Sequence, residues 1–215
     1  MNRLDLICIA NNKIIKENKQ KEITFVKSNK FDINKLKKEY SKINVKNKDL
    51  EKAVYVALSF YPELKNTKIT FKQLTFGIVE HPILMAAARF KTTSILTGKR
   101  HYVILLNKKY GKYLLKEFSF NSTVYLIAHE LSHVVDYEQK SRLDLLKFGA
   151  KYLIPKHRLT TEFETDIRVI HRGLGEHMKT YLDDINNSKS VPSRFKKYRS
   201  KYYLVKKDIK NIKIK

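Results

Sequence analysis

Apolar residues in the middle of the chain recur at a spacing of three and four positions, which is the period of one face of an α-helix. The stripe follows Asn121 or Ser122, whose side-chain oxygen can cap the first free N–H groups of a helix. Its members are Val124, Ile127, Ala128, Leu131, Val134 and Val135. The pattern predicts a central helix that begins after Gly111 and runs to about Glu138.

The same spacing predicts helices on either side of the central one. A second long helix is expected from about Thr160 to His171, with Thr160 or Thr161 as its N-cap. Gly173 and Gly175 are expected to end or kink it, and Gly149 and Pro155 to interrupt the stretch before it. Shorter helices are predicted at Ile33 to Tyr40 and at residues 50 to 58, the latter capped by Asn47 or Asp49 and ended before Pro62.

Segments with alternating or β-branched residues predict short strands. The candidates are Asp5 to Ala10, Ile23 to Lys27, Lys68 to Leu74, Ile83 to Phe90 and His101 to Asn107, with Thr97-Gly98 as a turn before the last. The run from Met85 to Ala88 is also compatible with a helix. Several helices combined with a few short strands predict an α+β fold.

A length of 215 residues suits one large domain with extensions. We expect an N-terminal extension at residues 1–44, the main domain at 45–185, and a basic, aromatic C-terminal segment at 186–215. Residues 194–215 hold ten Lys or Arg against one Asp, with aromatic residues between them. We therefore expect this segment to dock through its aromatic rings with its lysines turned outward.

The formal net charge of +24 raises the question of a nucleic-acid partner. Of the 45 basic residues, 36 are lysine and only 9 are arginine, and they are spread along the whole chain. Arginine is the side chain preferred for bidentate phosphate and base contacts. Nucleic acid is therefore not favoured as the main partner.

Other features of the composition indicate a protein of the cytoplasm. No run approaches the roughly 18 apolar residues that a membrane span requires, and the first residues lack the pattern of a signal peptide. The single cysteine, Cys8, permits no internal disulfide. Its apolar neighbours predict a small buried side chain.

The sequence His-Glu-Leu-Ser-His at positions 129–133 lies within the predicted central helix. Residues four apart share one helix face, so His129 and His133 can bind the same metal ion. Glu130 is about 100° round the helix, which suits a carboxylate that contacts a metal-bound water without binding the metal. Chance alone would produce only about 0.01 such matches in a chain of this His and Glu content.

A catalytic zinc ion needs three protein ligands, so a third residue must come from elsewhere. In the second long helix, Glu162 and Asp166 are four residues apart, so that one carboxylate can bind the metal while the other holds a ligand histidine. Glu164 lies about 200° round from Glu162 and is expected to point away. The alternatives to Glu162 as third ligand are His157, His171 and His177, whereas Asp136 is expected to be a supporting or capping group.

The HELSH motif followed 29 residues later by Glu-x-x-x-Asp resembles the gluzincin clan of zinc metallopeptidases, and its compact minigluzincin members in particular. The resemblance covers roughly residues 45 to 180. It implies a zincin-like fold, in which a small mixed sheet packs on the motif helix and a second helix carries the third ligand. It implies that His129, His133 and Glu162 bind one zinc ion, that Glu130 is the general base, and that Asp166 orients a histidine. Thr161 stands where the clan often has an asparagine.

These features together predict a soluble metallopeptidase that hydrolyses peptide bonds with a zinc-activated water. Candidate residues for stabilising the tetrahedral oxyanion are His157, His171, Tyr137 and Tyr152. The expected partner is a peptide or protein substrate. Two alternatives remain open: a zinc-stabilised binding protein without catalysis, and a basic protease-like protein that works on nucleic-acid-bound proteins.

Overall fold

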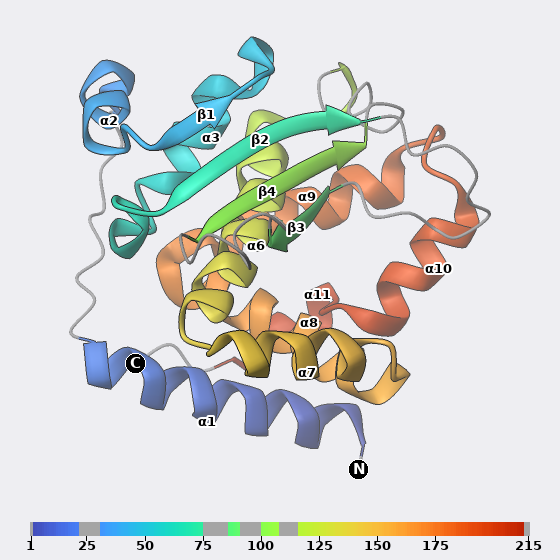
Figure 1. Cartoon of the computed structure of the whole chain (residues 1–215). Helices are drawn as coiled ribbons and strands as arrows, with labels where there is room; N and C mark the ends of the chain where they lie inside the picture. The colour runs from blue at the N-terminus through green and yellow to red at the C-terminus, as the bar shows by residue number, and fades with distance from the viewer. Residues whose placement is uncertain (1, 22–30, 75–85, 91–99, 108–115, 213–215) are drawn as a thin grey trace.

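A computed structural model describes residues 2–21, 31–74, 86–90, 100–107 and 116–212. The strand predicted at Ile23 to Lys27 and the turn at Thr97-Gly98 lie outside these residues. The described part is mostly helical and contains one small sheet (Figure 1). The combination of helices with a sheet confirms the expected mixture of α and β structure.

The sheet has four strands in the order β1-β2-β4-β3 within the described residues. They are β1 (Ile43–Val45), β2 (Lys68–Leu74), β3 (Ala86–Phe90) and β4 (His101–Asn107). β2 pairs in parallel with both β1 and β4, whereas β3 is antiparallel to β4. The sheet is therefore mixed. The predicted bounds of β2 and β4 are confirmed, and β3 occupies the described part of the stretch from Ile83 to Phe90.

The central helix is α6 (Phe120–Glu138), and every residue from Ser122 to Asp136 is buried. It packs against α3 (Glu51–Leu58), α8 (Pro155–Val169), α9 (Gly175–Asn187) and strand β3. The sequence predicted an apolar stripe on one face, but a helix surrounded by other elements is buried on all sides. The polar side chains of the motif are therefore inside the protein.

The remaining helices lie around this centre (Figure 1). They are α1 (Arg3–Lys21), α2 (Ile33–Glu39), α7 (Arg142–Tyr152), α10 (Ser193–Tyr202) and α11 (Lys206–Ile209), with short 3-10 turns η1 (Lys48–Leu50) and η2 (Pro62–Leu64). A π-helical turn, η3 (Ile170–Leu174), separates α8 from α9. Gly173 has a φ of 85° in this turn, a value that glycine adopts without steric cost, so the predicted kink is confirmed.

The strand predicted at Asp5 to Ala10 is wrong, because these residues belong to α1. The buried positions Leu6, Ile7, Ala10 and Ile14 follow helical spacing. They face α8, against which α1 packs. Cys8 points the other way and is exposed, so its predicted burial is also wrong.

Three predictions about where helices begin or break are wrong. The N-cap of α6 is Ser119, whose Oγ accepts from the N–H of Ser122 at 3.2 Å, instead of Asn121 or Ser122. α8 begins at Pro155, five residues before the predicted start, because proline is favoured in a first helical turn. Gly149 does not interrupt α7, since it lies inside that helix.

One continuous hydrophobic core joins residues from all three stretches that the sequence suggested. Leu6 and Ile14 of α1, Phe163 of α8, and Leu204 after α10 belong to the same cluster. The boundaries at 44/45 and 185/186 stay a prediction. In the C-terminal segment, Phe195 is buried. Among the described residues, no helix combines the length and the apolar character needed to cross a membrane.

Candidate metal centre

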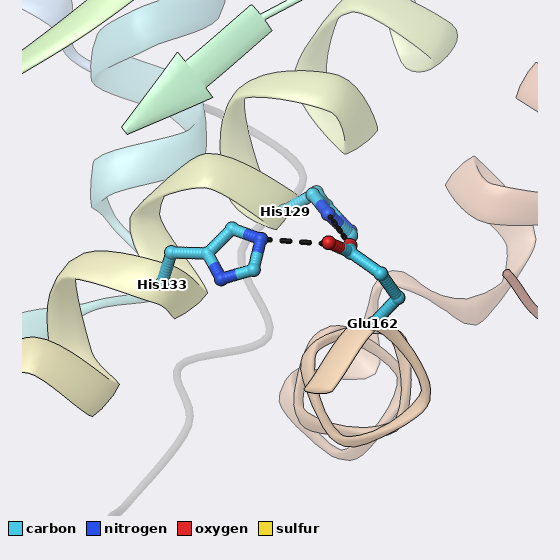
Figure 2. A group of neighbouring side chains, drawn as sticks. All are labelled: His129, His133 and Glu162. Atoms are coloured by element: carbon cyan, nitrogen blue, oxygen red, sulfur yellow. Dashed lines mark hydrogen bonds and ion pairs between the residues drawn. The ribbon is translucent and has the colours of Figure 1, made fainter. Parts of the chain in front are cut away.

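Three buried side chains from two helices converge at the middle of the protein. His129 and His133 come from successive turns of α6, and Glu162 comes from α8, which packs beside it. Figure 2 shows the two imidazole rings and the carboxylate pointing toward one another. Their exposed fractions are only 4%, 6% and 1%. We call these residues the His129–His133–Glu162 group.

The distances within the group fit a tetrahedral metal ion. Nε2 of His129 lies 3.0 Å from Oε2 of Glu162, and Nε2 of His133 lies 3.6 Å from the same oxygen. One ligand atom of each residue lies within 4.8 Å of the others. In a regular tetrahedron with metal–ligand bonds of about 2.1 Å, ligand atoms are about 3.4 Å apart. Two imidazoles and a carboxylate are also a donor set that zinc accepts.

The second nitrogen of His129 is held by Asp166. Nδ1 of His129 lies 2.9 Å from Oδ1 of Asp166, and because a carboxylate only accepts, the ring N–H donates to it. Asp166 also accepts from the hydroxyl of Tyr125 at 2.6 Å and from the backbone N–H of Leu204 at 3.0 Å. These contacts fix the position of the Asp166 carboxylate. The carboxylate then orients the His129 ring so that Nε2 points toward Glu162.

His133 is oriented by Thr165 and Tyr137. The hydroxyl of Thr165 donates to the carbonyl of Thr161 at 2.8 Å, so its oxygen remains able to accept from Nδ1 of His133 at 3.4 Å. The Tyr137 ring stacks on the imidazole, with a centroid separation of 6.1 Å. Both histidines therefore present Nε2 to the same point.

Glu162 has a partner for its other oxygen. The hydroxyl of Tyr152, at the end of α7, donates to Oε1 of Glu162. Burial by itself would raise the pKa of Glu162, but His133 and His129 outweigh it and hold that pKa far below its ordinary value. Glu162 is therefore ionised at neutral pH, as a metal ligand must be.

The pKa of His129 is shifted in the opposite direction to that of Glu162. Burial lowers the pKa of this imidazole, but its hydrogen bonds to Asp166 and Glu162, together with their negative charges, raise the pKa to about 10. Two carboxylates thus stabilise one positive charge at Nε2 or beside it. That charge can be a proton or a metal ion.

Glu130 is buried next to this group, on the same turn of α6 as His129. Burial raises the pKa of Tyr137 and of Tyr203, and the negative charge of Glu130 raises both pKa values further. Both tyrosines contact the motif histidines, since the Tyr203 ring centroid lies 5.5 Å from that of His129. Glu130 therefore lies among the residues that surround the group without belonging to it.

The other residues singled out from the sequence lie in different environments. His157 is exposed, His171 pairs through Nε2 with Asn11 of α1 at 2.7 Å, and His177 is half-buried on α9. The structure places none of the three in the His129–His133–Glu162 group. Asp136 forms an ion pair with Lys140 at 2.5 Å, and Glu164 forms one with Lys13 of α1 at 2.5 Å.

Sequence reasoning missed the residues that support the group from distant parts of the chain. Tyr61 donates to the carbonyl of Ala128 at 2.6 Å and contacts Ser132 Oγ at 2.8 Å, so it braces the motif itself. Arg199 of α10 donates to the Tyr125 hydroxyl at 3.2 Å and to the carbonyl of Leu204 at 2.9 Å. A tyrosine or arginine far away in sequence carries no local signal of such a contact.

Comparison with known proteins found no match to this chain among protein-family models, curated proteins or solved structures.

Proposed function

We propose that this protein is a zinc-dependent metallopeptidase with a zincin-like fold and one zinc ion per chain. The observation that carries the proposal is the convergence of Nε2 of His129, Nε2 of His133 and Oε2 of Glu162, with each Nδ1 held by another side chain. In this arrangement two histidines from one helix and a glutamate from a neighbouring helix bind the metal, and Asp166 orients His129.

Zinc, when bound, supplies a Lewis acid that polarises a substrate carbonyl and lowers the pKa of water at the site. The remaining steps belong to the chain. Glu130, which is not in the ligand set, accepts the proton from the attacking water and delivers it to the leaving amine. The buried position of Glu130 beside His129 supports this role.

Tyr137 is the best placed of the four predicted candidates for stabilising an oxyanion. Burial, followed by the charges of Glu130 and Glu162, raises the pKa of Tyr137. Burial and Glu162 likewise raise the pKa of Tyr152. Both hydroxyls therefore stay protonated at neutral pH, but the Tyr152 hydroxyl already donates its hydrogen to Glu162. Tyr137 is therefore the residue proposed to donate a hydrogen bond to a developing negative charge. His157 is exposed and His171 is engaged with Asn11, so neither has comparable support.

The substitution Glu130→Gln tests the catalytic role. It removes the proton acceptor but no metal ligand, so we expect zinc content and thermal stability close to those of the wild type, with peptide hydrolysis lowered by at least about 100-fold. Elemental analysis after desalting and a general peptidase assay measure the two effects. Equal rates in the two proteins, with contaminating peptidases excluded, would contradict the assignment of Glu130.

A zinc-stabilised protein without catalysis is the second candidate, and the deep burial of the group favours it. Structural zinc sites usually have four protein ligands, whereas the described residues supply three, as in catalytic sites. This alternative expects one zinc ion but no hydrolysis in either the wild type or Glu130→Gln. The same pair of measurements therefore separates the two functions. We further propose that the protein acts in the cytoplasm.

A further inference from the structure

Helix α7 (Arg142–Tyr152) has no buried residue, although it carries several large apolar side chains. Leu143, Leu146 and Leu153 are 60%, 65% and 74% exposed. With Ala150, which is also exposed, they are spaced by three, four and three residues. At about 100° per residue they form one continuous apolar stripe along the helix and its C-cap.

The opposite side of α7 is attached to the protein. Leu145, Phe148 and Tyr152 are half-buried and share that side. The Phe148 ring lies 5.6 Å from the Tyr137 ring, centroid to centroid, and the Tyr152 hydroxyl donates to Glu162. The outward direction of the leucine stripe is therefore fixed by contacts on the inner side. An exposed stripe of leucines on a helix that is held in place indicates a surface that binds an apolar partner, such as another protein or a membrane.

The charges beside the leucine stripe indicate which apolar partner it binds. Between residues 140 and 158 the chain has six Lys or Arg and a single acidic residue, Asp144. Lys147 and Lys151 are exposed next to the stripe, and their long side chains can reach past it. A helix with leucines outward and basic residues along the rim is typical of binding in the plane of an anionic membrane surface. The net charge of +24 adds a long-range attraction to the same surface.

We propose that the outer face of α7 docks on the surface of a bilayer that contains acidic phospholipids. The helix lies in the plane of the interface, with Leu143, Leu146 and Leu153 between the lipid headgroups and Lys147 and Lys151 at the phosphates. This proposal is independent of catalysis. Because the Tyr152 hydroxyl donates to Glu162, docking in this orientation puts α7 between the membrane and the proposed metal centre.

The apolar part of the proposal is tested with Leu143→Gln/Leu146→Gln, which leaves the net charge unchanged. Both side chains are exposed, so the fold should be retained, and circular dichroism and thermal unfolding check this. The matched control is Phe120→Gln, an exposed aromatic residue at the other end of α6, about 27 Å along that helix from Glu138. Flotation of the full chain with phosphatidylcholine vesicles, with and without phosphatidylserine, measures binding.

We expect the wild type and Phe120→Gln to bind the phosphatidylserine vesicles at physiological ionic strength and not the neutral ones. The leucine double variant should bind at least about tenfold more weakly, because two apolar side chains no longer leave water. Wild-type protein that does not bind, or a double variant that binds as well as the wild type, overturns the proposal. The second of these outcomes would mean adsorption by net charge alone.

The charged rim is tested with Lys147→Gln/Lys151→Gln. Its control is Lys42→Gln/Lys46→Gln, which removes the same charge beside β1, on the opposite side of the molecule from α7 (Figure 1). Only the α7 pair should weaken vesicle binding strongly, and equal losses would argue against a specific face. Size-exclusion chromatography with light scattering provides a separate check. A wild-type dimer that the leucine double variant converts to a monomer would make a second copy of the chain the occupant of the stripe and reject the membrane.

Discussion

His129 and His133 are the same residue type on the same helix face, yet their surroundings differ in charge. The second nitrogen of His129 faces the carboxylate of Asp166, whereas that of His133 faces the neutral hydroxyl of Thr165. Glu162 in turn accepts from Tyr152. Each residue of the group therefore depends on other side chains for its orientation, and single substitutions should have unequal effects.

The carboxylates of α8 should differ in how much each contributes to zinc affinity. Glu162→Gln removes a proposed ligand and should weaken zinc binding the most. Asp166→Asn keeps all ligands but loosens His129, which typically costs about 10- to 100-fold in metal affinity. Glu164→Gln should change little, since Glu164 pairs with Lys13 of α1 instead. Competition against a zinc chelator measures the order, and zinc loss in Glu164→Gln but not in Glu162→Gln would contradict the ligand assignment.

Zinc affinity should also depend on pH through His129. The pKa of this imidazole is raised to about 10 in the absence of a metal, so at neutral pH zinc must displace a proton from it. The apparent association constant should therefore rise by about tenfold for each pH unit between pH 6 and 8, from this one proton alone. Chelator competition at several pH values tests the slope. An association constant that is flat over this range would contradict the displacement of a proton from His129.

At the scale of elements, the two ends of the chain hold each other next to the centre. Arg3 at the start of α1 donates to Asp208 of α11 at 2.7 Å and to the carbonyl of Tyr203 at 2.5 Å. Its guanidinium also lies 4.6 Å from the Phe163 ring centroid. Because Leu204 donates to Asp166, the position of the C-terminal segment influences the orientation of His129.

Arg3→Ala should therefore loosen residues 193–212. Asp208 is buried and would lose its charged partner, keeping the hydrogen bond from the N–H of Val205. The loss of a hydrogen bond to a charged group costs about 1.5 to 3 kcal/mol. Hydrogen exchange in α10 and α11 should accelerate, with a smaller change in α3. Lys13→Ala is the matched control, because its ion pair with Glu164 is more exposed and does not reach the C-terminal segment. Equal protection of α10 and α11 in Arg3→Ala and wild type would count against this role for Arg3.

At the scale of the whole molecule, the proposed metal centre joins α6 and α8 inside a single core. A ligand that binds only the folded state stabilises it by mass action, by about 2.7 kcal/mol at a concentration of 100 times the dissociation constant. Chelation should therefore lower the Tm of the wild type, and added zinc should restore it. His133→Ala should show neither response. A wild-type Tm that ignores both chelator and zinc would argue against a metal in the core.

Features that depend on neighbours along the chain could be predicted from the amino-acid sequence. The bounds of β2 and β4 followed from alternation and β-branched residues, and the pairing of His129 with His133 followed from helical periodicity. The spacing of Glu162 and Asp166 on one helix face was likewise a local property. Such features need no knowledge of which elements meet.

Features that depend on contacts between distant residues could be seen only in the folded protein. Asp5 to Ala10 is helical because its apolar side chains pack on α8. The composition of this segment also suits a strand, and its sequence does not reveal that α8 is its partner. The His129–His133–Glu162 group is supported across up to 74 residues of sequence by Tyr61, Tyr152, Arg199 and the backbone of Leu204. The outward direction of the α7 leucines was decided in the same way. Burial is a property of the assembled fold, so a periodic apolar pattern predicts a helix face but not what that face meets.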